Sequence, residues 1–292
     1  MKLEHVHRLQ TGFPDLIVFL PFVAALALYA CGEIVSSQRY GPWPKIRSIC
    51  WLAGVLSAAA AVAGPIAVQA RTDFAAHMIG HVLLGMLAPL LLALAAPVTL
   101  LLRTLSVRQA RRLSRWLADW PLPRLLTDPA VASLLNVGGL WILYTTGLYG
   151  RMHHFPLLHF LVHVHIFLAG YWFTAAFLYI DPVPHRRSFV YRAAVLTLAW
   201  AAHDILAKFI YAHPPAGVPA EQAEAAGMIM YYGGDAVDLA LIVLFCFQWY
   251  KARRVRGDLL FGGKPSPGLF GGRPSPKLSG SVTRGQDRHP KR

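Results

Sequence analysis

The sequence predicts an all-α integral membrane protein, a bundle of about seven transmembrane helices with a disordered basic C-terminal tail. Of its residues 55% are hydrophobic and only 14% are charged, whereas soluble domains are nearer a quarter charged. The apolar residues also gather in long runs, and a helix needs about 20 of them to cross the hydrocarbon core. Seven runs meet that length: 16–35, 46–68, 76–102, 129–149, 157–180, 189–211 and 227–250.

Lys and Arg fall in alternate connections between these runs. The connections on one side, together with the C-terminal tail, hold 22 of them and those on the other side hold 4. The positive-inside rule then places the N-terminus outside and the C-terminus in the cytoplasm of a cell inner (plasma) membrane. This pattern accounts for the net charge of +14 without nucleic acid as a partner, and the lipid bilayer is the expected environment.

Two domains are expected, a seven-helix transmembrane domain over 1–252 and a disordered cytoplasmic tail over 253–292. The tail repeats LFGGKPSP at 260–267 as LFGGRPSP at 269–276, and Gly, Pro and Ser at this density bury too little surface to fold. The loop at 103–128 alternates Arg with Leu and Trp, which is typical of an amphipathic helix on the membrane surface. Within the run 76–102 a kink is expected at Pro89 and at Pro97.

Histidines and methionines gather towards the outer ends of the predicted helices. His77 and His81 lie four residues apart on one helix and His159 and His163 on another, so each pair projects from one helix face. Two such imidazoles bind one metal ion, and Met sulfur favours Cu(I). The candidate ligands of a copper ion are His77, His81, His159, His163, His203, Met78, Met228 and Met230. A shared site requires the two helices to be neighbours and the imidazoles of the pairs to lie within about 4–5 Å of each other. The alternative is that each histidine packs as an ordinary hydrogen-bonded residue.

Other polar residues within the runs have structural and functional interpretations. Asp204 and Lys208 lie one helical turn apart and are expected to form an ion pair, with a proton relay as the alternative. Asp235 and Asp238 share a helix face, where they either orient ligand imidazoles or bond across helices. Asp73 is expected to cap the helix that carries His77 rather than to bind metal. No catalytic triad, phosphate loop or dinucleotide motif is present, so no small-molecule substrate is identified.

Three stretches resemble the caa3-type cytochrome c oxidase assembly factors, the CtaG family. They are HMIGHVLLGMLAPLLLALAAPVTLLLR at 77–103, HFLVHVHIFLAGYWFTAAFLYIDPVP at 159–184, and the Met-rich start with Gly-Gly in 226–254. The likeness covers most of 15–254, and its most specific parts are HMxxH with APVTLLLR and the His-rich helix that ends in DPxP.

The resemblance implies a non-enzymatic chaperone for a haem-copper oxidase, in transient contact with an oxidase subunit. A link to copper delivery is usual for such factors, whereas the ligand assignment comes from the spacing. Two alternatives stay open. One is a transporter for copper or another ion, with Asp204, Lys208 and Asp235 along the path. The other is a bis-histidine b-type cytochrome, for which His77, His81, His163 and His203 are the candidate ligands.

The predicted topology has a direct test. A C-terminal alkaline phosphatase fusion should be inactive, because this enzyme does not become active in the cytoplasm. A C-terminal fluorescent protein fusion should be bright, because this protein does fluoresce there. An active phosphatase with a dark fluorescent protein would reverse the topology and move the histidines to the cytoplasmic side.

Overall fold

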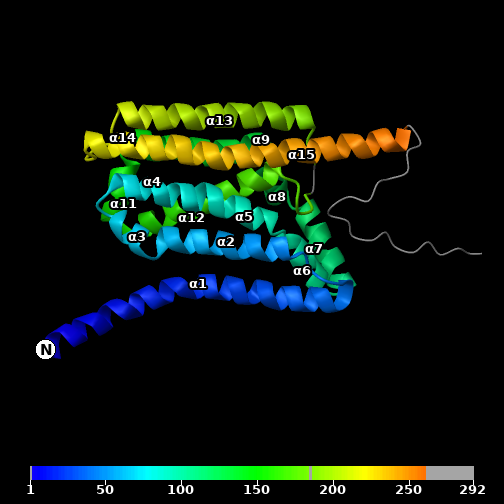
Figure 1. Cartoon of the computed structure of the whole chain (residues 1–292), viewed down its shortest axis with the longest axis horizontal. Coiled ribbons are helices and arrows are strands. Elements are labelled where there is room, and N and C mark those ends of the chain that lie inside the picture. The colour runs from blue at the N-terminus through cyan, green and yellow to red at the C-terminus, as the bar shows by residue number, and fades with distance from the viewer. Residues whose placement is uncertain (1, 184–185, 261–292) are drawn as a thin grey trace, which may run out of the picture. The chain divides into compact units, whose positions relative to one another are not determined.

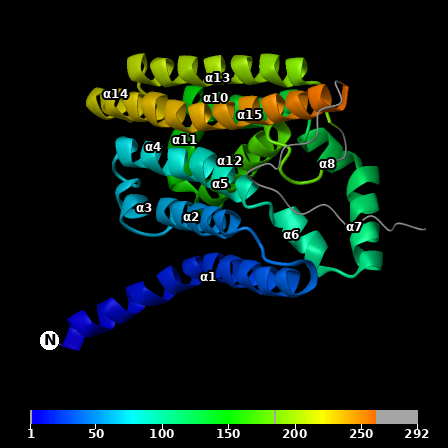
Figure 2. The same cartoon turned by 45° about the vertical axis from the view of Figure 1, so that its right-hand side comes forward.

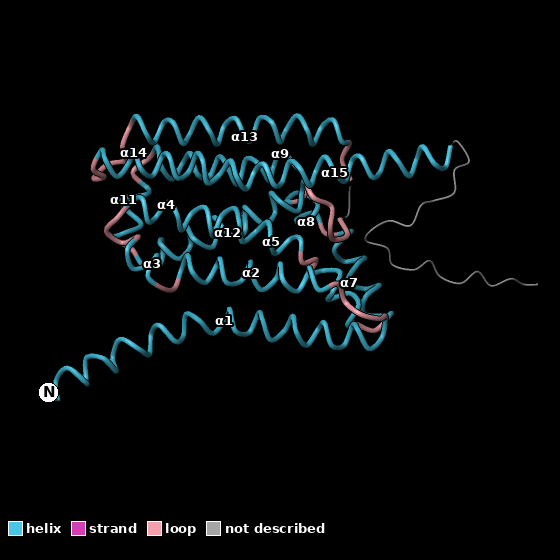
Figure 3. Tube along the Cα trace, in the orientation of Figure 1, coloured by secondary structure: helices cyan, strands magenta, loops and turns pink. Residues whose placement is uncertain are grey.

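The computed structural model describes residues 2–183 and 186–260, which are helices joined by short connections with no strand among them (Figures 1 and 3). Three of the helical segments are π-helical turns, η1 (Leu83–Leu87), η2 (Leu134–Gly138) and η3 (Ile229–Gly233). The α-helices are α1 (Lys2–Tyr40), α2 (Lys45–Val62), α3 (Pro65–Gln69), α4 (Phe74–Val82), α5 (Ala88–Leu94), α6 (Pro97–Thr104), α7 (Val107–Asp119), α8 (Pro121–Leu126), α9 (Pro129–Ser133), α10 (Gly139–Thr145), α11 (Leu148–His154), α12 (Pro156–Phe177), α13 (Phe189–Ala212), α14 (Ala220–Met228) and α15 (Gly234–Leu260).

The predicted membrane bundle is confirmed. Within the described residues, six helical stretches are long and apolar enough to cross a membrane. The number is seven if the bent pair formed by 129–145 and Leu148–His154, which meet at 79°, counts as one span. Each of these stretches overlaps one of the seven expected runs. The bend divides the fourth expected run, since its C-terminal end turns away as the separate helix α11.

Close packing between α12 and the η1–α5 segment depends on two glycines. A Cβ atom built on Gly170 would collide with the backbone carbonyl of Gly85 and would lie 3.0 Å from Cγ of Pro89. In a bilayer, small residues let helix backbones approach because lipid offers no hydrophobic drive to bring them together. The third and fifth predicted spans are therefore direct neighbours, as a metal site shared between them requires.

The two prolines of the third run act differently. Pro89 is the second residue of α5, just after the π-helical turn η1, and such an irregularity is common next to a proline in a helix. Before Pro97 the helix breaks completely, with Ala96 in the left-handed conformation at φ 54°. The Tyr29 hydroxyl donates to the Ala95 carbonyl at 2.9 Å, so a carbonyl beside the break keeps a partner inside the membrane.

The other side of this break is capped by Asp181, in the DPxP turn that follows α12. Its carboxylate accepts from the backbone amides of Val98 at 3.1 Å and Thr99 at 2.7 Å, and from the Thr99 hydroxyl at 2.6 Å. These amides are the first free donors of α6. One carboxylate therefore joins the two most distinctive motifs of the sequence, APVTLLLR and DPxP.

The described bundle has two chemically different ends. α3, α4, α11 and α14 lie at one end, which carries the candidate histidines, and α6, α7 and α8 lie at the other (Figure 1). α1 and α13 occupy opposite edges in both views (Figures 1 and 2). The expected amphipathic segment forms α7, which begins with a capping box between Ser106 and Gln109 and buries none of its side chains. The last helix continues to Leu260, beyond the boundary expected at residue 252. The repeat region from 261 onward lies outside the described residues.

Replacing Asp181 with Ala should lower the free energy of unfolding by about 2 kcal/mol, because two amides and a hydroxyl lose their acceptor. Asp181→Asn should lose less, since the amide oxygen still accepts. The measurement is thermal unfolding of the purified protein in detergent. Asp119→Ala at the exposed end of α7 is the control, and an equal loss there would contradict the capping role.

Candidate functional site

Three of the predicted ligands, His77, His159 and His163, line one cavity and are called here the outer histidine group. The cavity has a volume of about 700 Å³ and lies between α1, α2, α4 and α12. The rings of His159 and His163 stack with centroids 4.2 Å apart. The ring of His77 faces His163 across the helix interface at 6.3 Å between centroids.

His163 has a fixed tautomer. Its Nδ1 lies 2.9 Å from the backbone carbonyl of His159, and a carbonyl only accepts, so Nδ1 carries the proton. Nε2 is then the nitrogen with the free lone pair. A backbone carbonyl that orients one ring nitrogen in this way is typical of imidazoles that ligate metal through the other.

His77 is held by aromatic neighbours. It stacks on Phe74 at 5.9 Å, meets the edge of Tyr149 at 5.1 Å, and its Nε2 lies 3.2 Å from the Tyr144 hydroxyl. That hydroxyl donates weakly towards the sulfur of Met78 at 4.0 Å. A hydroxyl that donates to sulfur accepts from Nε2–H, which leaves the free lone pair on Nδ1 of His77.

His81 and His203 lie elsewhere and are called here the inner histidine pair. Each is 4% exposed, and both line a second, smaller cavity that none of the outer group lines. Their ring centroids are 6.5 Å apart. The structure therefore distributes the four paired histidines between two cavities, with His77, His159 and His163 at one and His81 at the other.

The three predicted methionine ligands line neither of these cavities. Met78 and Met230 are fully buried in an apolar cluster that includes Tyr144 and Leu206, and Met228 is 48% exposed. Met86, which the sequence interpretation leaves out of the ligand set, lines the inner cavity. Among the described residues, no three His, Cys, Asp or Glu side chains are already gathered around a single metal position. Binding at the outer group therefore needs side-chain movement.

The intramembrane charges differ in part from expectation. Asp204 and Lys208 do not form the predicted ion pair, since the Lys208 ammonium lies over the Tyr231 ring, 4.9 Å from its centroid. Asp235 accepts from the indole nitrogen of Trp200 at 2.8 Å, a bond across helices. Asp73 caps α4 by accepting from the Ala75 amide at 2.8 Å, as predicted.

A comparison with models of known protein families assigns the chain to a family. The model described as cytochrome c oxidase caa3 assembly factor (Caa3_CtaG) matches residues 27–252. The chain belongs to this family. The match begins within the first candidate span and ends within the last, and it contains both histidine groups.

Relatives with detectable sequence similarity are larger proteins. An uncharacterized protein of Mycobacterium bovis and one of Mycobacterium tuberculosis are each 31% identical over 197 residues, which is 65% of this chain and 30% of theirs. An uncharacterized protein of Mycobacterium leprae is 29% identical over 181 residues, 60% of this chain and 28% of its own. This chain therefore aligns with less than a third of the relatives' length. No solved structure matches it.

Chemical modification should separate the two histidine groups. Diethyl pyrocarbonate, which acylates neutral imidazoles, should modify His159 and His163 in the folded protein faster than His81 and His203. The reason is that the inner imidazoles are 4% exposed at a small cavity. Peptide mass spectrometry after timed exposure measures this order, with exposed His213 as the fast reference. Equal rates for His81 and His159 would contradict the division.

Proposed function

We propose that this protein assists the assembly of a haem-copper cytochrome c oxidase by holding copper at the outer histidine group before the metal reaches an oxidase subunit. Family membership supports the assembly role. The observation that carries the copper role is the convergence of His77, His159 and His163 on one cavity. Copper is the cargo in this proposal and no bond is made or broken in a substrate, so no catalytic residue is assigned.

The chemistry of the outer group suits a transferable ion. Imidazole is a good ligand for copper in both oxidation states. Here two of the three ring orientations leave one identifiable nitrogen free, Nε2 of His163 and Nδ1 of His77. Because the rings of these two residues stand 6.3 Å apart and no metal position is already formed, an ion is held through modest side-chain rotations and released through the same motions.

The space between the inner histidine pair is too small for the haem that the b-type cytochrome alternative requires. Two axial histidines need a porphyrin between them, whereas the cavity that His81 and His203 line has a volume of about 20 Å³. That is space for about one water molecule. No observation favours the transport alternative, for which Asp204, Lys208 and Asp235 are the candidate path.

The proposal predicts that a His159→Gln/His163→Gln double variant lowers oxidase activity and the copper content of the oxidase in a deletion strain. The two changes remove two of three ligands while keeping polar side chains. A His213→Gln variant is the control, because His213 is exposed and stacks only on Phe209. Full oxidase maturation in the double variant would overturn the copper role. Rescue of the deletion strain by added copper would favour transport instead.

Copper binding to the outer group should weaken in acid, because a ligating nitrogen must be unprotonated. Metal analysis of the purified protein after equilibration at pH 5 and at pH 7.5 measures this. The His159→Gln/His163→Gln variant should bind less at pH 7.5 and show a smaller difference between the two pH values. A pH-independent copper content that the variant shares would place the metal elsewhere.

A further inference from the structure

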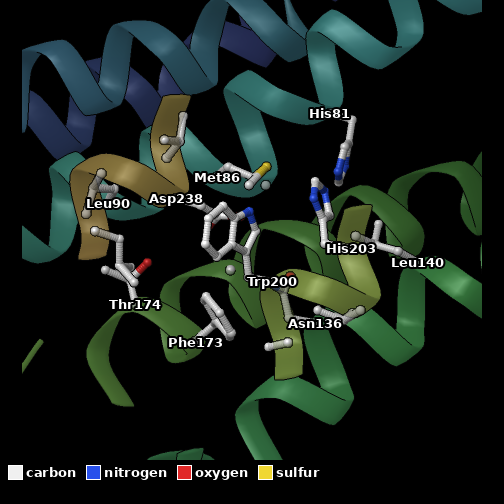
Figure 4. Close-up of a pocket in the computed structure, with 16 residues that line it drawn as sticks. His81, Met86, Leu90, Asn136, Leu140, Phe173, Thr174, Trp200, His203 and Asp238 are labelled. Carbon is white, nitrogen blue, oxygen red and sulfur yellow. The ribbon is translucent and has the colours of Figure 1, made fainter. Parts of the chain in front are cut away.

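The ring nitrogens of the inner histidine pair are buried without hydrogen-bond partners. None of the four ring nitrogens of His81 and His203 has a hydrogen-bond partner, although Nδ1 of His203 lies 4.0 Å from the Asp204 carboxylate, and both side chains are buried. A buried polar atom without a partner is costly, and more so in a bilayer. Figure 4 shows the two imidazoles pointing towards one another from different helices, His81 from α4 and His203 from α13. Because both unpartnered imidazoles point to the same place, a ligand bound between them would lower the free energy of both.

Glycines create the space that each imidazole occupies. A Cβ atom on Gly234 would lie 2.6 Å from Cε1 of His203 and 3.5 Å from the methyl carbon of Met86. A Cβ atom on Gly85 would lie 3.2 Å from Cε1 of His81. The His81 ring therefore packs against Gly85 and the His203 ring against Gly234, and a larger residue at either position would displace the ring beside it.

The helices around this cavity share an irregularity at the same place. Met86 lies in the π-helical turn η1, Asn136 lies in η2, and Gly234 directly follows η3. Single π-helical turns inside α-helices occur often at functional sites because they redirect side chains. Met86 and Asn136 both line the inner cavity. Two of these turns line the small cavity, and the third precedes the glycine that lies against His203, which indicates a built site rather than a packing defect.

We propose that the inner histidine pair, with the thioether of Met86, binds one Cu(I) ion at a site separate from the outer histidine group. An ion about 2.0–2.1 Å from each nitrogen places two facing imidazole centroids roughly 6 Å apart, and the observed separation is 6.5 Å. The ion gives one nitrogen of each ring a coordinate bond, so two of the four unpartnered ring nitrogens gain a partner. The cavity of about 20 Å³ accepts a single ion or water and nothing larger.

The lining selects Cu(I) over Zn²⁺. Two imidazoles and a thioether form a neutral, partly soft set, which favours Cu(I), whereas structural Zn²⁺ takes four ligands. A monovalent ion also carries the smaller charge into the membrane. Asp238 also lines this cavity and is 7% exposed.

The test uses the full chain in detergent, loaded with Cu(I) under anaerobic conditions and then treated with a water-soluble Cu(I) chelator. The His159→Gln/His163→Gln variant should keep one chelator-resistant ion per chain, and a His81→Gln/His203→Gln variant should lose it. X-ray absorption of the retained copper should show nitrogen and one sulfur, and Met86→Leu should remove the sulfur. Equal retention by the inner variant, or none in the outer variant, would overturn the site and leave a water between the rings.

Two neighbouring glycines supply a matched control that changes no ligand. Gly234→Ala should abolish the resistant ion by displacing His203. Gly233→Ala should keep it, because its Cβ atom would lie 3.6 Å from Val82, an ordinary contact. Loss in both would indicate a general folding defect, which melting temperatures would reveal, and retention in both would overturn the site. The experiment measures copper bound to the purified protein. A negative result would therefore contradict the inner site without contradicting the oxidase assembly role.

Discussion

The contact between Gly85 and Gly170 positions both histidine groups at once. It brings the backbones of η1 and α12 together at a point where a single added carbon would meet a carbonyl oxygen. His81 precedes this point by one turn on its helix, and His163 precedes it by two turns on the other. With the two helices fixed against each other here, His77 faces His163 and His81 is directed past α12 to α13. A larger residue at either glycine would separate the helices and widen both distances.

The broken third span creates a second constraint, because an interrupted helix inside a bilayer leaves backbone groups that must find partners. Tyr29 from α1 and Asp181 from the turn after α12 supply them. Trp43 donates to the same Tyr29 hydroxyl at 3.0 Å, so α1 and the start of α2 are attached to the break as well. The break therefore ties α1, α5, α6 and α12 together at the end of the bundle opposite the histidines.

Much of this architecture was predictable because its signals are local. Length and hydropathy identify the spans, and Asp73 at the start of a helical run predicts the cap that is found. Long-range pairing was not predictable. Nothing near Asp181 in the sequence shows that it bonds to Val98 and Thr99, and the i,i+4 spacing of His77 and His81 indicates a shared face without revealing that the two rings line different cavities. Lys208 was misassigned for a related reason, since an aromatic ring on another helix competed with the local carboxylate.

The outer histidine group and the inner histidine pair differ in hydrogen bonding, and this difference affects how easily each would exchange a metal ion. The outer rings keep hydrogen bonds, to a carbonyl for His163 and a hydroxyl for His77, and they line a cavity of about 700 Å³. A side chain with such bonds is stable without a metal, which suits a site that gains and loses its cargo. The inner rings have no such bonds, so the ion proposed between them would supply the partners that the protein does not. Physical chemistry therefore favours exchange at the outer group and retention at the inner pair, even though both use the same side chain and share one helical face through His77 and His81.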